Sequence, residues 1–292
     1  MTKKDVYQDV TNRIIEALEN GLDGKFELPW HGVSQLPENA HTAKKYKGIN
    51  VPLLWAYQMS EGYQSGIWAT YKQWQERGAQ VRKGEKCAQI VFWKMLEQEP
   101  SSDNEEQSVR MFARWSRVFN ADQVDGFTPD SDFIPSDIAS IGAADALIDA
   151  SGADIRHEET RAFYSPSGDF INMPAPERFK ETHDSTATEN YYSTLFHELT
   201  HWTGAKHRLD RFPCEKFSKS DYAFEELVAE LGAAMACAVT GVEALPRADH
   251  AKYIACWLKS LKDDKKFIFS AASHAQKAVD FLQSTPGIEG AA

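Results

Sequence analysis

The sequence predicts an α+β protein with two domains, a mixed α/β domain followed by a largely helical one. Helical periodicity recurs at both ends of the chain, and segments rich in Val, Ile, Phe and Trp at 87–96 and 108–119 predict strands. A stretch rich in Asp, Ser and Pro at 126–136 suits a linker. With 292 residues and 42% hydrophobic side chains, the chain is long enough for two packed domains. We therefore expect domains over 1–125 and 137–292.

The first part of the chain carries the signals of three helices. Apolar residues recur every four positions and predict a first helix that ends near residue 21, at Val6, Val10, Ile14 and Leu18. Asn50 is the expected N-cap of a second helix, with Pro52 in its first turn. Thr70 is the expected N-cap of a third helix, which stops at Gly78.

Short strands and further helices are expected in the rest of the chain. Gly84 marks a turn between strands, and an acidic loop is expected over 97–107, between the two long strands. After the linker we expect a helix to about Ala150. Three short strands should follow, near 155–156, 162–164 and 169–173, with a hairpin turn at 165–168. The last helices are expected near 221–240, 247–262 and 265–283.

The chain contains the pattern H-E-x-x-H, in which His197 and His201 flank Glu198. Residues four apart on a helix lie one turn apart on the same face, so the two imidazoles can bind one zinc ion. Glu198 can then take a proton from metal-bound water. Apolar residues around the motif recur at helical spacing, at Leu195, Leu199 and Trp202. Gly204 suits the end of this helix. The pattern predicts a metallopeptidase site; two histidines on an ordinary half-buried helix are the alternative.

Two kinds of residue compete to be the third protein ligand, which a catalytic zinc site usually needs. His207 completes the longer pattern H-E-x-x-H-x-x-G-x-x-H, but that pattern also requires a methionine in a tight turn. Met235, the only methionine after the motif, lies in an apolar helical pattern instead. Glu226 lies one turn before Glu230, so one carboxylate can bind metal while the other hydrogen-bonds a ligand histidine. We favour Glu226, with His207, Glu225 and Glu230 as alternatives.

Composition narrows the classes of protein to which the chain can belong. The longest uncharged apolar stretch, 231–239, is too short to span a bilayer, and the first residues lack the apolar run of a signal peptide. The four cysteines are widely spaced, which indicates reduced thiols in a cytoplasmic protein rather than a disulfide framework. The sequence contains no phosphate-binding pattern G-x-x-x-x-G-K-[ST]. We therefore expect a cytoplasmic protein with no membrane partner.

The net charge of −11 conceals a basic region near the N-terminus. Residues 40–96 hold nine basic and three acidic side chains, and six of the eight tryptophans lie within 1–125. Aromatic faces can stack on unpaired bases while cations follow the phosphates, which is how single strands are bound without sequence preference. Trp55, Trp93 and Trp115 are expected in the core. The candidate DNA-binding residues are Lys44, Lys45, Lys47, Trp68, Tyr71, Lys72, Trp74, Arg82, Lys83 and Lys86.

Several segments together resemble the ArdC-type antirestriction proteins of conjugative plasmids, whose N-terminal region is shared with TraC-type plasmid primases. In the N-terminal half, the matching residues are 29–30, 46–50, 68–74 and 78–86. In the C-terminal half, they are 163–164, 169–174, 192–198 and 223–227. The segments are spread over nearly the whole chain, and together they are specific to this family.

The resemblance implies an N-terminal domain that binds single-stranded DNA and a C-terminal zincin-like metallopeptidase domain. It also implies a role in protecting incoming plasmid DNA from host restriction. The expected metal is Zn²⁺, with Mn²⁺ or another divalent ion as alternatives, and the protein or peptide substrate is open. The alternative function is a non-catalytic protein that coats single-stranded DNA, in which the metal only supports the fold.

In the predicted mechanism, Glu198 is the general base and the metal polarises the scissile carbonyl. Tyr164, Tyr192 and His207 are candidates for stabilising the oxyanion, and the sequence does not choose among them. Zincins place a sheet above the metal helix, and its edge strand can pair with an extended peptide. The segment 169–173 is the expected strand for that role.

Overall fold

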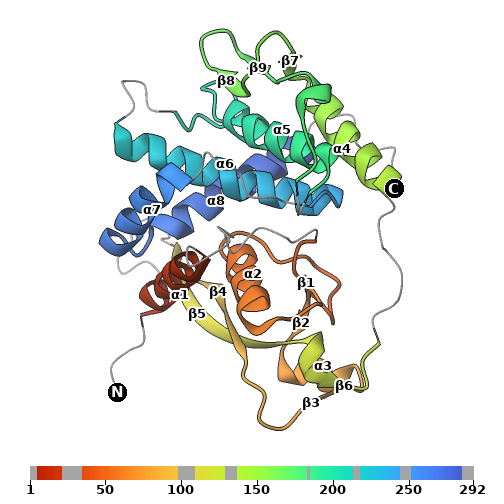
Figure 1. Cartoon of the computed structure of the whole chain (residues 1–292). Coiled ribbons are helices and arrows are strands. Elements are labelled where there is room, and N and C mark those ends of the chain that lie inside the picture. The colour runs from red at the N-terminus through yellow and green to blue at the C-terminus, as the bar shows by residue number, and fades with distance from the viewer. Residues whose placement is uncertain are drawn as a thin grey trace.

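The computed structural model describes residues 5–21, 35–97, 109–128, 137–182, 185–212, 218–243 and 251–284. It confirms the α+β class, because helices accompany a sheet in the N-terminal half and a small sheet lies beside the helices of the C-terminal half (Figure 1). The predicted acidic loop and the predicted linker lie almost entirely outside the described residues. Within the described ranges, no helix is long and apolar enough to cross a membrane.

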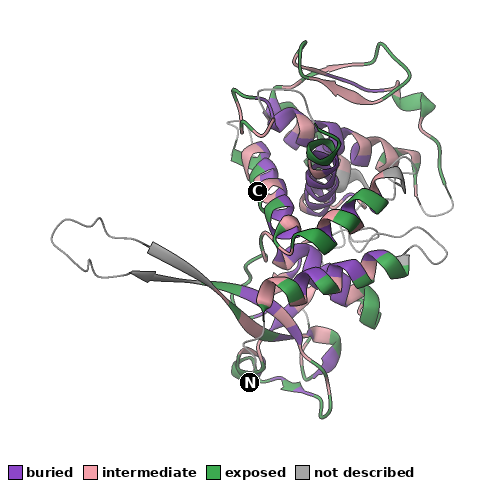
Figure 2. Ribbon diagram, turned by 90° about the vertical axis from the view of Figure 1, so that its left-hand side faces the viewer, coloured by how far each residue is buried: buried purple, intermediate pink, exposed green. Residues whose placement is uncertain are grey.

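The N-terminal half combines three helices with six short or long strands among its described residues. The helices are α1 (Val6–Gly21), α2 (Asn50–Glu61) and α3 (Tyr71–Glu76). The strands are β1 (Glu38–Asn39), β2 (Ile67–Ala69), β3 (Gln80–Val81), β4 (Ala88–Glu97), β5 (Val109–Asn120) and β6 (Val124–Asp125). One sheet has the order β1-β2-β5-β4, and β3 pairs with β6. β4 and β5 continue beyond the other strands as an antiparallel two-stranded ribbon (Figure 2).

The three predicted N-terminal helices are present, but the two predicted caps differ in outcome. Thr70 caps α3, because its hydroxyl accepts from the backbone N–H of Gln73 while the Gln73 side chain accepts from the Thr70 N–H. Asn50 does not cap α2: Ile49 occupies the N-cap position and makes no side-chain cap bond. The Asn50 amide instead forms two hydrogen bonds of 2.8 Å with the backbone of Val91. Asn50 therefore ties α2 to the outer strand β4.

The described C-terminal residues form five long helices and a three-stranded sheet, close to the predicted positions. The helices are α4 (Asp137–Ser151), α5 (Ala187–Thr203), α6 (Lys219–Thr240), α7 (Ala251–Asp263) and α8 (Phe267–Ser284). The strands are β7 (Asp154–Arg156), β8 (Phe163–Ser165) and β9 (Phe170–Asn172). A 3₁₀ turn over Pro176–Arg178 leads towards α5.

The small sheet has the order β7-β9-β8, so the expectation that 169–173 forms an edge strand is wrong. β9 lies between a parallel neighbour, β7, and an antiparallel neighbour, β8. The buried side chain of Asn172 explains this position. Its Oδ1 accepts from the backbone N–H groups of Glu158 and Glu159, and its Nδ2 donates to the Arg161 carbonyl. Asn172 of β9 thus holds the loop that connects β7 to β8, through hydrogen bonds to three of its backbone groups.

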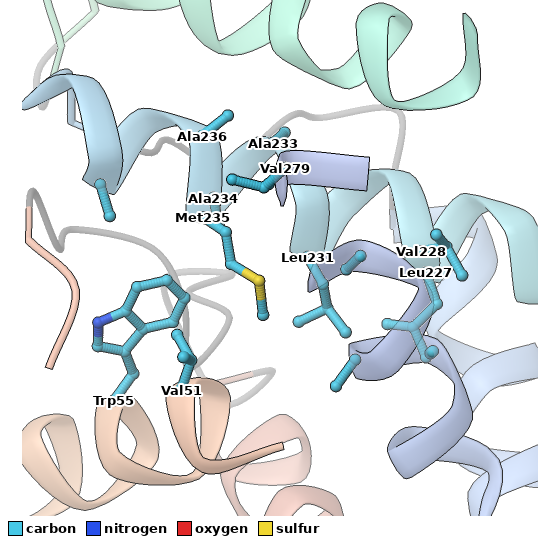
Figure 3. Close-up of a cluster of buried hydrophobic side chains, with 14 of the residues drawn as sticks. Val51, Trp55, Leu227, Val228, Leu231, Ala233, Ala234, Met235, Ala236 and Val279 are labelled. Atoms are coloured by element: carbon cyan, nitrogen blue, oxygen red, sulfur yellow. The ribbon is translucent and has the colours of Figure 1, made fainter. Parts of the chain in front are cut away.

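One hydrophobic cluster runs through both halves of the molecule and includes residues of α2 and of α6. Val51 and Trp55 of α2 point towards Met235 of α6 (Figure 3). Trp55 is fully buried, as predicted. A polar bond also joins the halves, since the Thr11 hydroxyl donates to the Lys265 carbonyl over 2.8 Å. The N-terminal half is therefore packed directly against the C-terminal helices, α6 among them (Figure 3).

Candidate functional site

The H-E-x-x-H residues lie in the last two turns of α5. Thr186 begins this helix with a capping box, in which its hydroxyl accepts from the Glu189 N–H and the Glu189 carboxylate accepts from the Thr186 N–H. The helix ends at Gly204 as predicted, but the φ of Gly204 is −75°, which any residue can adopt. A Cβ on Gly204 would lie 2.7 Å from the Phe212 ring, so the glycine is needed for close approach of the following loop.

Three side chains with metal-binding atoms converge from α5 and α6. The Nε2 atoms of His197 and His201 lie 3.2 Å apart, and Glu226 oxygens lie 3.6 Å and 3.7 Å from them. Donors bound to one tetrahedral metal at about 2.0–2.2 Å lie roughly 3.3–3.6 Å from one another. The spacing therefore suits a single divalent ion. Glu198 is buried beside His197 on the same helix.

The electrostatic state of Glu226 also suits a cation. Burial opposes ionisation of this carboxyl, but a hydrogen bond from His197 and the proximity of His201 outweigh it. The pKa of Glu226 is therefore held at about 2. Glu226 is a carboxylate across the physiological pH range, and it is one of the three groups that gather at the site among the described residues.

Two more carboxylates of α6 lie behind the histidines. Glu225 Oε1 lies 3.2 Å from Nδ1 of His201, and Glu230 Oε2 lies 3.7 Å from Nδ1 of His197. Carboxylates at these positions orient the rings and leave each Nε2 available to a metal. Glu230 was expected either to bind the metal or to support a histidine, and its carboxylate lies at ion-pair distance from Nδ1 of His197, on the side suited to support. Glu225 was considered only as a ligand, so its contact with His201 was missed.

Arg211 holds Glu225 in place. Its guanidinium donates to both Glu225 oxygens, over 2.8 Å and 3.1 Å, and its side chain is only 2% exposed. It also donates to the Thr200 carbonyl and the Thr203 hydroxyl at the end of α5. Burial opposes ionisation of Glu225, but bonds from His201 and Arg211 outweigh it and lower its pKa. Arg211, Glu225 and His201 thus form one polar chain that leads to the site.

The two helices that carry the site approach closely at Gly232. A Cβ there would lie 2.5 Å from Cγ2 and 2.7 Å from Oγ1 of Thr200. Such distances are shorter than side-chain carbons tolerate, so only glycine fits this position while the helices keep their separation. Gly232 lies six residues after Glu226, and Thr200 directly precedes His201. This contact therefore fixes the distance between the ligand-bearing segments.

His207 lies apart from the cluster. Its side chain is 62% exposed, and its Nε2 lies 3.1 Å from Oδ2 of Asp169. Asp169 also binds Arg208 through both oxygens and accepts a 2.8 Å hydrogen bond from Tyr164. The Arg208 guanidinium stacks over the Trp202 ring at 3.8 Å. His207 therefore belongs to a clamp that joins the β8–β9 turn to the end of α5.

The predicted oxyanion candidates are engaged elsewhere, whereas another tyrosine adjoins the site. Tyr164 donates to Asp169, and Tyr192 donates to Asp145 over 2.6 Å. Tyr222, one turn before Glu226 on α6, hydrogen-bonds Glu226 and is 49% exposed. Burial of its hydroxyl and the nearby Tyr253 and Glu226 raise the pKa of Tyr222. Tyr222 was missed, although its spacing of four from Glu226 was visible in the sequence.

The structure corrects part of the predicted DNA-binding surface. Trp68 and Trp74 are fully buried, and Trp74 Nε1 donates to the Phe119 carbonyl over 3.1 Å. Neither indole offers a face to a base, because each packs into the N-terminal core. Tyr71 is 44% exposed and remains accessible. Trp93, expected in the core, is 36% exposed because it lies where the ribbon leaves the sheet.

The predicted cations are exposed, but they differ in their surroundings. Four lie within 4 Å of carboxylates: Lys45 with Glu38, Lys47 with Asp280, Lys72 with Glu76, and Arg82 with Glu85 and Asp125. Within the described part of the chain, Lys44, Lys83 and Lys86 have no such carboxylate partner. The structure therefore leaves the last three as the more available cations for phosphate groups.

Both halves of the chain match known protein families. Residues 142–274 match the zincin-like metallopeptidases, and residues 4–119 match the N-terminal domain of anti-restriction factor ArdC. The fold and the site thus define a two-domain protein with an ArdC-type N-terminal domain and a zincin-like metallopeptidase domain.

Relatives of similar length narrow this class. The metal-free crystal structure of antirestriction protein ArdC from plasmid R388 matches with a TM-score of 0.80 and 42% identity, covering 97% of this chain and 98% of that one. The Mn(II)-bound structure of the same protein matches with a TM-score of 0.77, 41% identity and the same coverage. An uncharacterised protein of Sinorhizobium fredii, y4eC, is 41% identical over 97% of this chain and 93% of its own length. The chain belongs to the ArdC family of antirestriction proteins.

Longer relatives share the same module. A DNA primase TraC of Escherichia coli is 37% identical over 96% of this chain, and a second is 34% identical over the same share. The chain spans only 27% and 20% of the lengths of these primases. The predicted relation to TraC-type primases is therefore confirmed for the part of each primase that this chain matches.

Proposed function

We propose that this chain is a divalent-metal-dependent peptidase that also binds single-stranded DNA, and that both activities protect incoming plasmid DNA from restriction. The observation that carries the peptidase assignment is the convergence of His197, His201 and Glu226 on one point, with their binding atoms within 4.8 Å of one another. The Mn(II)-bound structure of the R388 relative supports a divalent ion at this site. Zn²⁺ is the ion that the donor set of two imidazoles and one carboxylate suits best, with Mn²⁺ as the alternative.

Each residue of the site has a distinct role in this proposal. A bound divalent ion would supply Lewis acidity and lower the pKa of water at its open position. Glu198 takes a proton from the attacking water and returns it to the leaving amine as the peptide bond breaks. Tyr222 hydrogen-bonds Glu226 and so orients the carboxylate that would hold the ion. The net reaction adds one water across the peptide bond, giving a carboxyl and an amine.

Glu198→Gln tests the peptidase assignment, because glutamine keeps the shape of the side chain and cannot accept the proton. We expect the variant to keep its melting temperature and its metal affinity. Its cleavage of a labelled casein substrate should fall by about 100-fold or more, since a general base contributes roughly 10²–10⁴-fold. His207→Ala is the matched control and should cleave at the wild-type rate. If neither the wild type nor Glu198→Gln cleaves, a protein that only coats DNA is favoured, and if both cleave at the same rate, Glu198 is not the general base.

The DNA-binding assignment rests on the N-terminal match to the ArdC domain and on the basic segment 40–96. Lys44, Lys83 and Lys86 supply cations without nearby carboxylate partners among the described residues. Binding of a fluorescent dT oligomer should weaken steeply with salt, because phosphate contacts release counterions. Tighter binding to duplex than to single strands, or a flat salt response, would contradict the assignment.

A further inference from the structure

An open groove of about 660 Å³ lies between the start of α1 and the ribbon of β4 and β5. It is lined by Val6, Phe92, Ala113, Arg114, Trp115 and Ser116. None of these residues belongs to the candidate metal site, and none was among the predicted DNA-binding residues. Its volume lies within the range of roughly 300–1,000 Å³ that is usual for ligand pockets.

The side chains of the groove combine an exposed ring with a cation. Phe92 is 60% exposed, more than any other large hydrophobic side chain described. Arg114 is its direct partner in the β4–β5 ladder, and direct partners project from the same face of a sheet. Trp115, the next residue along β5, projects from the opposite face of the ribbon and packs against the core, so it does not join this pair. An exposed phenyl ring beside a guanidinium suits a base and an adjacent phosphate, because the ring can stack on the base while the cation contacts the phosphate.

The charge of the ribbon favours an anionic partner. The two strands carry four basic residues, Lys94, Arg110, Arg114 and Arg117, and one acidic residue, Glu97. Arg114 and Arg117 are exposed, and within the described ranges neither forms an ion pair. The nearest carboxylate in sequence to Val6 is Asp5, which is paired with Lys265 over 2.5 Å. Several cations of the predicted surface are, in contrast, already paired with carboxylates.

We propose that this groove binds an unpaired stretch of DNA, with one base stacked on Phe92 and an adjacent phosphate at Arg114. This inference rests on the proposed single-stranded DNA binding, and it places the main contact on the β4–β5 ribbon. The lysines near residues 44 and 83 then serve as additional phosphate contacts. An extended peptide could instead pair with the free edge of β5 before Phe119, where β2 does not reach. Such backbone pairing needs neither the Phe92 ring nor the Arg114 charge.

The experiment compares binding of 5′-fluorescein-labelled dT12 by the full chain and by single variants, using fluorescence anisotropy across a salt series. Phe92→Ala should raise Kd by about 5- to 150-fold, the usual loss for a stacking aromatic. Arg114→Ala should raise Kd and reduce the slope of log K against log salt by about 1. Met59→Ala and Arg178→Ala, an exposed apolar side chain and an exposed arginine outside the groove, are the controls and should change Kd by less than about twofold.

The outcomes separate this inference from the DNA-binding assignment itself. If the wild type binds dT12 and both groove variants bind equally well, the groove assignment is overturned while DNA binding stands; a peptide-pairing groove would give this result. If the wild type binds no single strand, both assignments fail. Because Phe92 and Arg114 are exposed, the variants should melt within about 2 °C of wild type, and a circular dichroism melt checks this.

Discussion

The metal site on α5 and α6 and the basic surface of the N-terminal half differ in how their charged groups are held. In the first, His197 and Glu226 are buried, His201 is partly buried, and further carboxylates and Arg211 surround them. In the second, the lysines are exposed, and their carboxylate neighbours are exposed or half-buried. Buried charges must be matched in geometry, whereas exposed ones are screened by water. A site of the first kind is therefore defined by a few residues, and a surface of the second kind by its summed charge.

The largest expected effect concerns the tryptophans that the N-terminal surface was expected to use. Trp74→Ala should lower the free energy of unfolding by about 3–5 kcal/mol, because a fully buried indole and its hydrogen bond to Phe119 are lost. Tyr71→Ala, at an exposed position on the same helix, should change it by less than about 0.5 kcal/mol. Urea denaturation measures both. If Trp74→Ala kept its stability but lost DNA binding, Trp74 would be a DNA-binding residue after all.

Removal of the α6 ligand should nearly abolish metal binding. Glu226→Ala should weaken Zn²⁺ or Mn²⁺ affinity by about 1,000-fold, since binding energies of roughly 10–16 kcal/mol are shared among few ligands. Competition with a fluorescent chelator gives the affinity. His207→Ala should bind metal as wild type does. The opposite pattern, loss in His207→Ala and retention in Glu226→Ala, would reverse the ligand assignment.

The supporting carboxylates should have a smaller effect. Glu230→Gln keeps the size of the side chain and removes the charge behind Nδ1 of His197. Metal affinity should fall by about 10- to 100-fold, as is usual for groups that orient a ligand histidine. Glu159→Gln, at an exposed carboxylate near the small sheet, is the matched control. An affinity within twofold of wild type would show that Glu230 does not support the ring.

The next prediction concerns Gly232, at the contact between α5 and α6. Gly232→Ala should destabilise the protein by about 1–2 kcal/mol, because the new methyl group would overlap Thr200. Gly142→Ala on α4, where no atom lies within 4 Å of an added Cβ, should stabilise slightly or have no effect. Thermal melts with and without metal separate stability from binding. Equal melting temperatures for wild type and Gly232→Ala would show that the two helices separate freely.

The smallest expected effect is the pH dependence of the Asp169 clamp. Hydrogen bonds from Arg208 hold the pKa of Asp169 at about 2, below the ordinary 3.8. Because the folded-state pKa is lowered, the carboxylate stabilises the fold above about pH 4 and loses this contribution between pH 4 and pH 2. Asp169→Asn should therefore cost about 1 kcal/mol or less at pH 7, since Asp169 is 41% exposed, and less at pH 2.

The control for this prediction is Asp154→Asn, which removes a solvent-accessible ion pair with Arg156 and should have a negligible effect at any pH. Asparagine tolerates the positive φ of 51° at position 169, so the substitution tests the charge and not the backbone. A loss of stability in Asp169→Asn that is the same at pH 7 and pH 2 would contradict the clamp.

Much of the fold and the centre of the site followed from local patterns. The four-residue spacing placed His197 and His201 on one face, and the apolar period of the next helix turned Glu226 towards them. The helices and strands began and ended near their turn and cap residues. These features depend on residues within one or two helical turns of each other, so they can be predicted from one sequence.

Contacts between residues far apart in the sequence could not be predicted from these local patterns. Nothing near Trp68 or Trp74 shows that the N-terminal core covers both indoles, and nothing near 169–173 shows that β9 lies between two other strands. Arg211 reaches Glu225 only because the loop after α5 folds back over the helix end. Tyr222 is different, because its spacing from Glu226 was available and was overlooked.

We propose that His197, His201 and Glu226 bind one divalent ion and leave a position open for water. A crystal structure of the protein grown with Zn²⁺ or Mn²⁺, with anomalous data at the metal edge, tests it most directly. We expect one strong peak bonded to Nε2 of both histidines and to a Glu226 oxygen, with solvent at the remaining position. A peak beside His207 and Asp169, or a metal enclosed by four protein ligands, would contradict it.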